Sequence, residues 1–374
     1  MTTTAGRYIQ SLAGYRTFVP NRLPPPLTIT PELARLIETT IHALGRVEMC
    51  RTLLPNIDLL IYSSLQREAI ASSTIEGTIA SVDELVRFQA LETAERQAVR
   101  EVANYVNALV WGCEQLQTRP ISANMMLGLH ERLLDDVRGA NQAGQFKRLQ
   151  NYIGSHVEGG INAAIFVPPP PEFVQDLIDD LEAYINAENR ESRLVQCALA
   201  HYQFETIHPF HDGNGRVGRL LIILQLIQLG LLTAPLIYPS VYFERRRETY
   251  YQLLQSVREQ SLWEDWLIFF VTGIKNQCDE TIQLTQLILD LREQLRQTII
   301  NARRKATMNE VLNAFFQHPL RSVREISDHT HLAHTTIQPA LDDLSDLGIV
   351  EEITGRQRGR MYVCRPILHA IMGG

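Results

Sequence analysis

Chemically capable residues are concentrated in one segment of this 374-residue chain, from His208 to Arg219, which reads HPFHDGNGRVGR. Its glycines Gly213 and Gly215 let backbone N–H groups approach a ligand closely. The segment lies between two helical patterns, so the second helix points its positive N-terminus at the same place, where anions bind. Arg216 and Arg219 are three residues apart and can share one face of that helix. Together these groups suit a polyphosphate better than a single carboxylate.

Two further side chains give the segment reactive chemistry. Asp212 supplies a hard oxygen ligand of the kind that binds Mg2+ beside phosphates. His208, at the start of the segment, is a titratable base. The residues therefore predict a magnesium-assisted reaction on a phosphate ester.

Other interpretations of the same residues explain less. Gly213, Gly215 and Gly218 match a dinucleotide fingerprint, but they follow a helical pattern and no acidic residue lies about 20 positions further on. No GxxxxGK(S/T) sequence occurs, which excludes a P-loop. A metal-dependent phosphohydrolase with His201, His208 and the pair His211–Asp212 as ligands leaves both arginines and the glycines unexplained.

The sequence HPFHDGNGR resembles the signature HPFx(D/E)GNGR of the Fic family at every specified position, and Arg219 fits its extended form. Upstream, SSTIEG from Ser72 to Gly77 resembles the family's inhibitory motif (S/T)xxxE(G/N). The segment 144–154 resembles the lead-in to the family's flap hairpin. Near position 246, where many relatives carry Asn, this chain has Arg246. The resemblance covers residues 30–275.

The resemblance implies an all-α Fic-type core with a small β-hairpin flap, and a protein adenylyltransferase. Such an enzyme moves AMP from ATP to a Tyr, Ser or Thr hydroxyl of a protein, itself included, and releases pyrophosphate. His208 would be the base and Asp212 the Mg2+ ligand. The implied phosphate-binding residues are Gly213, Asn214, Gly215, Arg216 and Arg219, and the implied flap residues that hold the target are Gly160, Ile161 and Phe166.

The inhibitory motif implies a self-inhibited enzyme. In the family, a glutamate of this helix pairs with the second motif arginine and blocks productive placement of the γ-phosphate. Here the glutamate is Glu76, flanked by Ser72 and Gly77, and the arginine is Arg219.

Helical periodicity and turn residues divide the chain into four predicted parts. Residues 1–100 form an N-terminal helical region, irregular up to residue 30, and residues 101–275 form the catalytic core with a flap at 151–168. Residues 276–305 are a linker helix, centred on an amphipathic pattern over Ile282–Ile300. Residues 306–374 have the order of elements of a winged helix-turn-helix, an α+β unit.

Composition indicates which partners and which cellular compartment to expect for the protein. The formal net charge is −7, which gives no general reason to expect nucleic-acid binding. No apolar run approaches 18 residues, and we expect no secretory signal. Five scattered cysteines without a CxxC pair indicate a reducing compartment, so we expect a cytoplasmic protein.

Some alternatives remain open at this stage. Glu76 could position a water in an enzyme that removes AMP from a protein. The chain could be a nucleotide-sensing DNA-binding regulator, since Arg356, Arg358 and Arg360 favour DNA, although Asp342, Asp343 and Asp346 oppose it. Relatives that move UMP or phosphocholine leave the donor open, and homodimer formation and the target protein stay undetermined.

Overall fold

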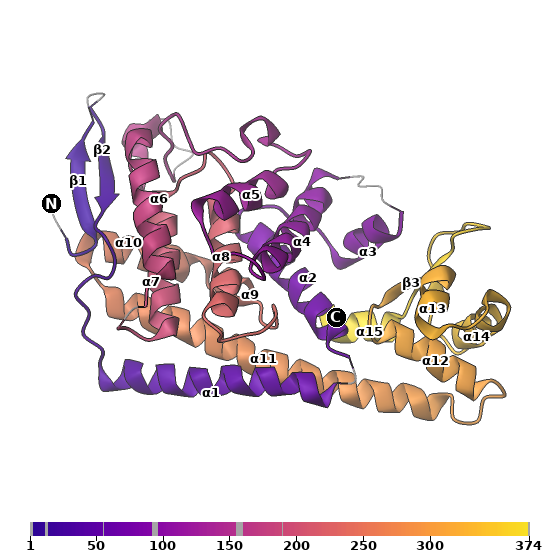
Figure 1. The fold of residues 1–374 in the computed structure, drawn as a ribbon. Coiled ribbons are helices and arrows are strands. Elements are labelled where there is room, and N and C mark those ends of the chain that lie inside the picture. The colour runs from indigo at the N-terminus through magenta and orange to yellow at the C-terminus, as the bar shows by residue number, and fades with distance from the viewer. Residues whose placement is uncertain are drawn as a thin grey trace.

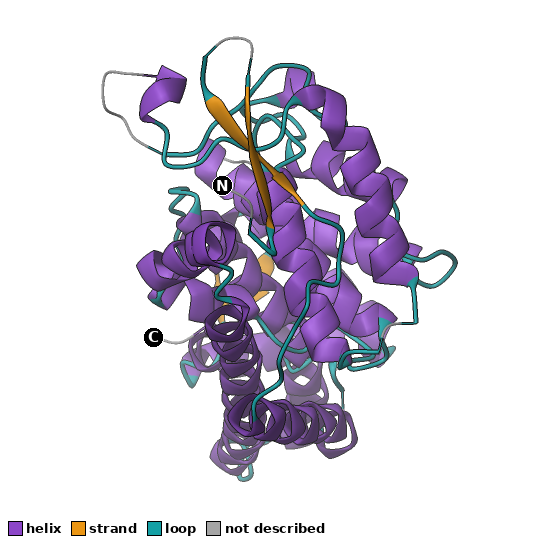
Figure 2. Ribbon diagram, turned by 90° about the vertical axis from the view of Figure 1, so that its left-hand side faces the viewer, coloured by secondary structure: helices purple, strands orange, loops and turns teal. Residues whose placement is uncertain are grey.

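The computed structural model describes residues 3–11, 14–54, 56–91, 96–154, 160–188 and 190–372. Most of these residues are helical, as the sequence predicts, and a small β-hairpin lies at the edge of the molecule (Figure 2). None of the described helices is long and apolar enough to cross a membrane. The helices before the C-terminal lobe are α1 (Pro31–Leu53), α2 (Asp58–Ile75), α3 (Val82–Leu91), α4 (Gln97–Gln115), α5 (Ala123–Leu133), α6 (Pro171–Asn186), α7 (Arg193–Ile207), α8 (Asn214–Gln228), α9 (Pro239–Arg245), α10 (Arg247–Gln260) and α11 (Trp263–Thr298).

Helices α7 and α8 form the centre of the core. Every residue of α7 from Leu194 to Ile207 is buried, and α8 is buried from Arg216 to Leu226. A helix that is buried on all sides lies inside a domain rather than on its surface. The predicted chemical segment joins these two helices, so the fold holds it between two buried helices.

Two long helices, α1 and α11, lie side by side along one edge of the molecule (Figure 1). The pattern over Ile282–Ile300 is helical as predicted, but the predicted start of this helix is wrong, because α11 runs unbroken for 36 residues from Trp263 to Thr298. At 1.5 Å per residue it is about 54 Å long. Its buried stripe continues through Phe270, Ile274 and Cys278, so no change of pattern marks the predicted boundary at residue 276.

The prediction that residues 1–30 are irregular is also wrong. Strands β1 (Gly6–Gln10) and β2 (Arg16–Pro20) form an antiparallel hairpin in which Tyr8 is paired with Phe18. Phe18 is fully buried, and its backbone N–H donates to the carbonyl oxygen of Val167 at 3.0 Å. The hairpin is therefore joined to the far side of the flap.

The flap pairing is confirmed by an antiparallel bridge between Ile153 and Phe166. Their backbone groups exchange two hydrogen bonds of 2.8 and 3.0 Å. Residues 155–159 of the predicted flap lie outside the described residues. On the return side, Gly160–Ala163 forms a short 3-10 helix rather than an extended strand.

A smaller C-terminal lobe follows α11. Its strands form an antiparallel sheet in the order β3-β5-β4. Two helices followed by two strands occur where the sequence predicts them; the assignment as a winged helix stays a prediction. The elements of the lobe are α12 (Lys305–Phe315), β3 (Leu320–Ser322), α13 (Val323–Thr330), α14 (His334–Asp346), β4 (Glu351–Glu352), β5 (Met361–Val363) and α15 (Arg365–Met372).

Candidate active site

His208 follows directly after α7 and takes the left-handed backbone conformation, with φ of 49°. That conformation is uncommon for a residue other than glycine, so surrounding contacts must hold it. The Asn151 amide donates to the carbonyl oxygens of His208 and Phe210, at 3.3 and 2.8 Å. Lys147 adds a backbone hydrogen bond to Pro209, and its ammonium group donates to Asn151. The loop is thus held from the segment that leads into the flap.

A second set of contacts holds the other end of the loop. The Asn214 side chain accepts from the N–H of Phe210 at 2.7 Å and donates to its carbonyl oxygen at 2.9 Å. The His130 ring stacks on Phe210, with centroids 3.9 Å apart, and its Nε2 lies 3.1 Å from the carbonyl oxygen of Asp212. Asn214 therefore closes the loop on itself in this structure, where the sequence predicted a phosphate ligand.

The electrostatics around His208 keep its imidazole neutral. Burial, together with the nearby Lys147 and Arg258 cations, lowers the pKa of His208 to about 3. A neutral imidazole can accept a proton at physiological pH. The structure therefore keeps this side chain in the unprotonated form that the predicted role as a base requires.

A cavity of about 500 Å3 opens beside His208. It brings together three residues of the motif segment, His208, Gly215 and Arg219, with the predicted inhibitory Glu76 and the predicted flap residue Phe166. Both sides of the flap bridge contribute to its wall. The remaining lining residues are Tyr152, Ile153, Gly154, Ile165, Phe166, Glu205, Arg247, Tyr251, Leu254, Gln255 and Arg258.

Glu76 occupies the anion position of this cavity. Its Oε1 lies 2.7 Å from Nη2 of Arg219, whose side chain is 1% exposed. Ser72 completes the contact, since its hydroxyl and carbonyl oxygens accept from Nε and Nη2 of Arg219 at 2.8 and 2.9 Å. A Cβ atom added at Gly215 would lie only 2.2 Å from Oε1 of Glu76. The carboxylate therefore rests directly on the first turn of α8, where a phosphate would otherwise gain the helix dipole.

The two motif arginines point to different partners. Although burial alone would lower it, the pKa of Arg219 is raised by the carboxylate of Glu76 and other nearby acidic groups. Arg216 instead lies 3.2 Å from Glu101 of α4 and 3.8 Å from Asp212, and its side chain is almost fully buried. Arg216 thus links the motif loop to Glu101 of α4, while Arg219 faces the cavity.

Asp212 is the predicted metal ligand. Its Oδ1 accepts from the N–H of Gly213 at 2.6 Å, and its side chain is 44% exposed. Asp212 does not line the cavity beside His208, but one exposed carboxylate fits Mg2+, which takes one or two carboxylates together with substrate phosphates. No group of three or more His, Cys, Asp or Glu residues that could hold a metal occurs in the described ranges.

His201 has a structural role instead of the metal-binding role in the phosphohydrolase interpretation. Its Nδ1 lies 3.1 Å from the carbonyl oxygen of Gly218, and its Nε2 lies 2.8 Å from the Tyr250 hydroxyl. Both ring nitrogens are therefore engaged inside the core. His201 is therefore not available as one of the metal ligands that the phosphohydrolase interpretation requires.

Four charged residues at the site were not predicted from the sequence: Lys147, Glu205, Arg247 and Arg258. Burial raises the pKa of Glu205 to about 7 and lowers that of Lys147 to about 7. Arg258 lies over the Phe166 ring, 3.8 Å from its centroid. Glu205 could have been noticed because it lies one helical turn before His208. The others come from segments whose proximity depends on tertiary structure.

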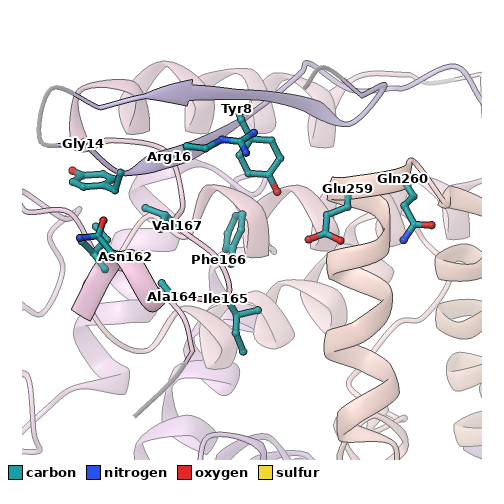
Figure 3. Close-up of a pocket in the computed structure, with 12 residues that line it drawn as sticks. Tyr8, Gly14, Arg16, Asn162, Ala164, Ile165, Phe166, Val167, Glu259 and Gln260 are labelled. Atoms are coloured by element: carbon teal, nitrogen blue, oxygen red, sulfur yellow. The ribbon is translucent and has the colours of Figure 1, made fainter. Parts of the chain in front are cut away.

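The predicted flap residues are separated in the structure. Phe166 is 3% exposed under Arg258, whereas its neighbour Ile165 is 68% exposed. Gly160 and Ile161 lie in the 3-10 helix, and Ile161 lines a second hollow of about 610 Å3. Figure 3 shows the hairpin residues Tyr8 and Arg16 on one side of this hollow and Ile165 to Val167 on another. Arg246, outside the cavity, lies over the Tyr242 ring.

The fold and the cavity define a helical protein with an anion site and a neutral histidine between its two most buried helices. Two family models match this arrangement in sequence: the N-terminal model of the Fic/DOC family at residues 34–114, and the Fic/DOC family model at residues 120–226. The chain belongs to the Fic/DOC family.

Individual proteins agree with this assignment. A Drosophila ananassae protein named protein adenylyltransferase Fic is 34% identical over 183 residues, which are 48% of this chain and 31% of that protein. The match thus spans about a third of that relative's own length. A Fic family protein from Desulfovibrio desulfuricans superposes with a TM-score of 0.59 at 20% identity, over 91% of this chain and 98% of its own. Fic-1 from C. elegans superposes with a TM-score of 0.52 at 20% identity, over 68% of this chain and 73% of its own. These two likenesses show the fold alone.

Proposed function

We propose that this protein transfers AMP from ATP to a hydroxyl group of a protein, and that Glu76 restrains the reaction. The proposal rests above all on one observation. A neutral histidine, the N-terminus of α8 and a buried arginine face the same cavity. Fic relatives named protein adenylyltransferase support the choice of AMP as the transferred group.

The reaction needs one proton transfer and one displacement. His208 accepts the proton of the target Tyr, Ser or Thr hydroxyl, and the freed oxygen attacks the α-phosphorus of ATP. A phosphorus–oxygen bond to the target forms while the bond to the bridging oxygen breaks, and pyrophosphate leaves with the electron pair. General-base help contributes about 10²–10⁴-fold, and positioning of the phosphates supplies much of the remaining acceleration.

The phosphates would lie over Gly215 and α8, with Arg219 as the cation for the terminal phosphate. Arg247 and Arg258 are further cations in the cavity wall. Mg2+ held by Asp212 would neutralise phosphate charge. The target segment would lie along the flap beside the exposed Ile165 and pair with its backbone.

Inhibition follows from the position of the Glu76 carboxylate. It takes the same guanidinium and the same helix turn that a terminal phosphate needs. ATP would then bind weakly, or with its α-phosphate out of line with the attacking oxygen. A misplacement of about 1 Å can cost about 10²-fold in rate.

The decisive experiment compares the native protein with Glu76→Gly in the presence of α-labelled ATP and Mg2+. We expect self-labelling to rise by at least about 10²-fold, because Arg219 becomes available to the nucleotide. Glu114→Gly, at a solvent-facing position near the end of α4, is the matched control and should label like the native chain. Equal labelling and equal ATP affinity in Glu76→Gly and the native chain would show that Glu76 does not inhibit.

Two further variants test how the restraint works. Glu76→Asp should label at an intermediate rate, because the shorter side chain reaches Arg219 less well. Adding Arg219→Ala to Glu76→Gly should remove most of the gain, since the freed guanidinium is what the nucleotide uses. Loss of activity on removal of Glu76 would instead favour an enzyme that removes AMP from proteins.

A second candidate function is binding of duplex DNA by the C-terminal lobe. A groove of about 740 Å3 between α13, α14 and the β4–β5 connection is lined by Arg324, Arg358 and Arg360, with His334 and Gln338. Asp343 lies away from this groove in an ion pair with Arg304. We expect labelled duplex DNA to bind with a steep salt dependence that weakens in Arg358→Ala. No binding at low salt would rule this function out.

A further inference from the structure

The helix that follows the inhibitory glutamate is docked on the C-terminal lobe. Helix α3 begins at Val82, six residues after Glu76. Its Val86 and Ala90 form a separate apolar cluster with Leu320, Val363 and Leu368 of the lobe. Asp83, in the first turn of α3, lies 2.8 Å from Arg365 at the start of α15. These contacts join the Glu76 loop to a part of the chain nearly 300 positions away.

Helix α2, which ends just before Glu76, is fixed by a different set of contacts. The carboxylate of Glu68 is buried and accepts from the Tyr105 hydroxyl at 3.0 Å and from the N–H of Ser240 at 2.9 Å. The carbonyl oxygen of Ile371 in α15 accepts from the Ser63 hydroxyl at 2.8 Å. Because α2 is held along its length, release of Glu76 must come from the loop beyond it and from α3.

The loop between α2 and α3 connects the site to the docked helix. The Thr78 hydroxyl donates to Glu101 at 2.8 Å, and Glu101 is the partner of Arg216 in the motif loop. Ser81 caps α3, because its hydroxyl accepts from the N–H of Glu84 at 3.2 Å. Glu76 through Ser81 therefore form a short tether between Arg219 and α3. The N–H groups of Glu76 and Thr78 also hold its first residues to α2, since both donate to the carbonyl oxygen of Ser73, at 3.1 and 3.0 Å. Movement of α3 away from the lobe would be transmitted along this tether.

The apolar cluster, rather than the ion pair, dominates this docking. Asp83 and Arg365 are 71% and 33% exposed, and exposed pairs change an equilibrium by at most about fivefold. Val86, Val363 and Leu368 are each no more than 3% exposed, so their separation would return their side chains to water. A substitution in the apolar cluster should therefore weaken the docking of α3 most. A substitution in the ion pair tests whether Asp83 and Arg365 contact each other as described.

We propose that the C-terminal lobe restrains the enzyme, with Val86 and Asp83 as positioning residues that keep Glu76 on Arg219 through α3. The proposal rests on the proposed adenylyltransferase function and names its regulation. Undocking of α3 from the lobe releases the Glu76 carboxylate and opens the anion position over Gly215. A ligand or protein that binds the lobe and displaces α3 would then act as an activator.

The test uses full-length Val86→Ser beside the native chain, Glu76→Gly and a matched control, Val110→Ser, whose side chain is exposed on α4. We expect self-labelling of Val86→Ser to rise about 5- to 150-fold, the usual range for coupling between sites, and to stay at or below that of Glu76→Gly. Amide hydrogen exchange over residues 74–81 should become faster in Val86→Ser and stay unchanged in Val110→Ser.

Substitution of the exposed Asp83 tests the same docking contact without disturbing the apolar core, so a change in labelling cannot be attributed to a general folding defect. Asp83→Arg should raise labelling by up to about fivefold, whereas Asp83→Glu, which keeps the charge opposite Arg365, should label close to the native rate. If Glu76→Gly is active while Val86→Ser labels like the native chain, the coupling is overturned and the proposed function stands. If Glu76→Gly is inactive, the proposed function fails; hydrogen exchange then decides the coupling, and unchanged exchange in Val86→Ser overturns it.

Discussion

At the scale of single residues, backbone conformation and buried contacts decide which side chains can act. The left-handed backbone conformation of His208 directs its side chain into the cavity. The Asn151 amide holds this conformation by donating to the carbonyl oxygen of His208. Its neighbour His211 is exposed and does not line the cavity. Two histidines of one motif therefore have different environments, and only one of them suits proton transfer.

His208→Ala, made in the active Glu76→Gly background, should reduce AMP transfer by at least about 10²-fold. ATP binding should remain measurable, because the imidazole acts on the proton of the target rather than on the nucleotide. His211→Ala is the control and should keep full activity. Labelling rates and ATP titrations check both parts; full transfer by the His208 variant would remove this residue from the mechanism.

The low pKa of His208 makes a prediction about pH. Because burial lowers this pKa to about 3, the imidazole stays in its base form down to well below neutral pH. Glu205 and Lys147 both have a pKa shifted to about 7 and would add titrations of their own. The background is therefore Glu76→Gly with Glu205→Gln and Lys147→Arg. Labelling rates should change by less than about twofold between about pH 6 and 8. An activity limb centred near the ordinary histidine pKa of about 6.5 would contradict this assignment.

The residue types and spacing of the motif were enough to predict a phosphate site, but not which side of the loop each side chain faces. Arg219 and Gly215 face the cavity as predicted, whereas Asn214 closes the loop and Arg216 pairs with Glu101. The direction of a buried arginine depends on where carboxylates from distant helices lie. That information is absent from a twelve-residue motif.

At the scale of elements, α2 is the most constrained part of the inhibitory apparatus. Glu68 is fully buried in its middle and links α2 to Tyr105 of α4 and to Ser240 of α9. A buried carboxylate in a helix is costly without such partners. Its role is to fix the helix from which the Glu76 loop departs.

Glu68→Ala should lower the free energy of unfolding by about 3 kcal/mol, because it leaves the Tyr105 hydroxyl and the Ser240 N–H without their acceptor. Urea unfolding followed by circular dichroism measures this change. Glu38→Ala, at an exposed position on α1, is the control and should cost less than about 1 kcal/mol. A loss of stability in Glu68→Ala as small as in the control would mean that water replaces the carboxylate.

Helices with clear periodicity were predictable as elements, and their ends were less so. The apolar pattern over 36–65 covers two helices, since α1 ends at Leu53 and α2 begins at Asp58. The hairpin β1–β2 was missed because its short strands gain their stability from contact with Val167 and from burial of Phe18. Contacts between distant segments cannot be inferred from local alternation of side chains.

At the scale of the whole molecule, the catalytic core and the C-terminal lobe share one continuous apolar cluster. Leu199 of α7, Ile288 of α11 and Leu341 of α14 all belong to it. Helix α11 carries this cluster from one part to the other without a break. The molecule should therefore unfold as one cooperative unit.

Leu341→Ala tests that expectation from the far end of the molecule. Leu341 is fully buried in α14, so its truncation should cost about 2–5 kcal/mol. Calorimetry should show a single transition at a lower temperature, and loss of the near-ultraviolet signal of the core tryptophans should coincide with it. Two transitions, of which only one shifts, would mean that the lobe unfolds independently.

The Glu76 carboxylate over Gly215 is a competitor covalently tethered to the site that it fills. Groups joined by short connections act on each other at effective concentrations in the millimolar range or higher, and dilution of the protein does not weaken them. The apparent affinity for a rival anion is reduced by the fraction of molecules in which the tethered group has left. A nucleotide with only two phosphates has no terminal group that must displace Glu76 from Arg219. If Glu76 restrains the enzyme as proposed, the loop would discriminate among adenine nucleotides by phosphate count, disfavouring the triphosphate while admitting the diphosphate.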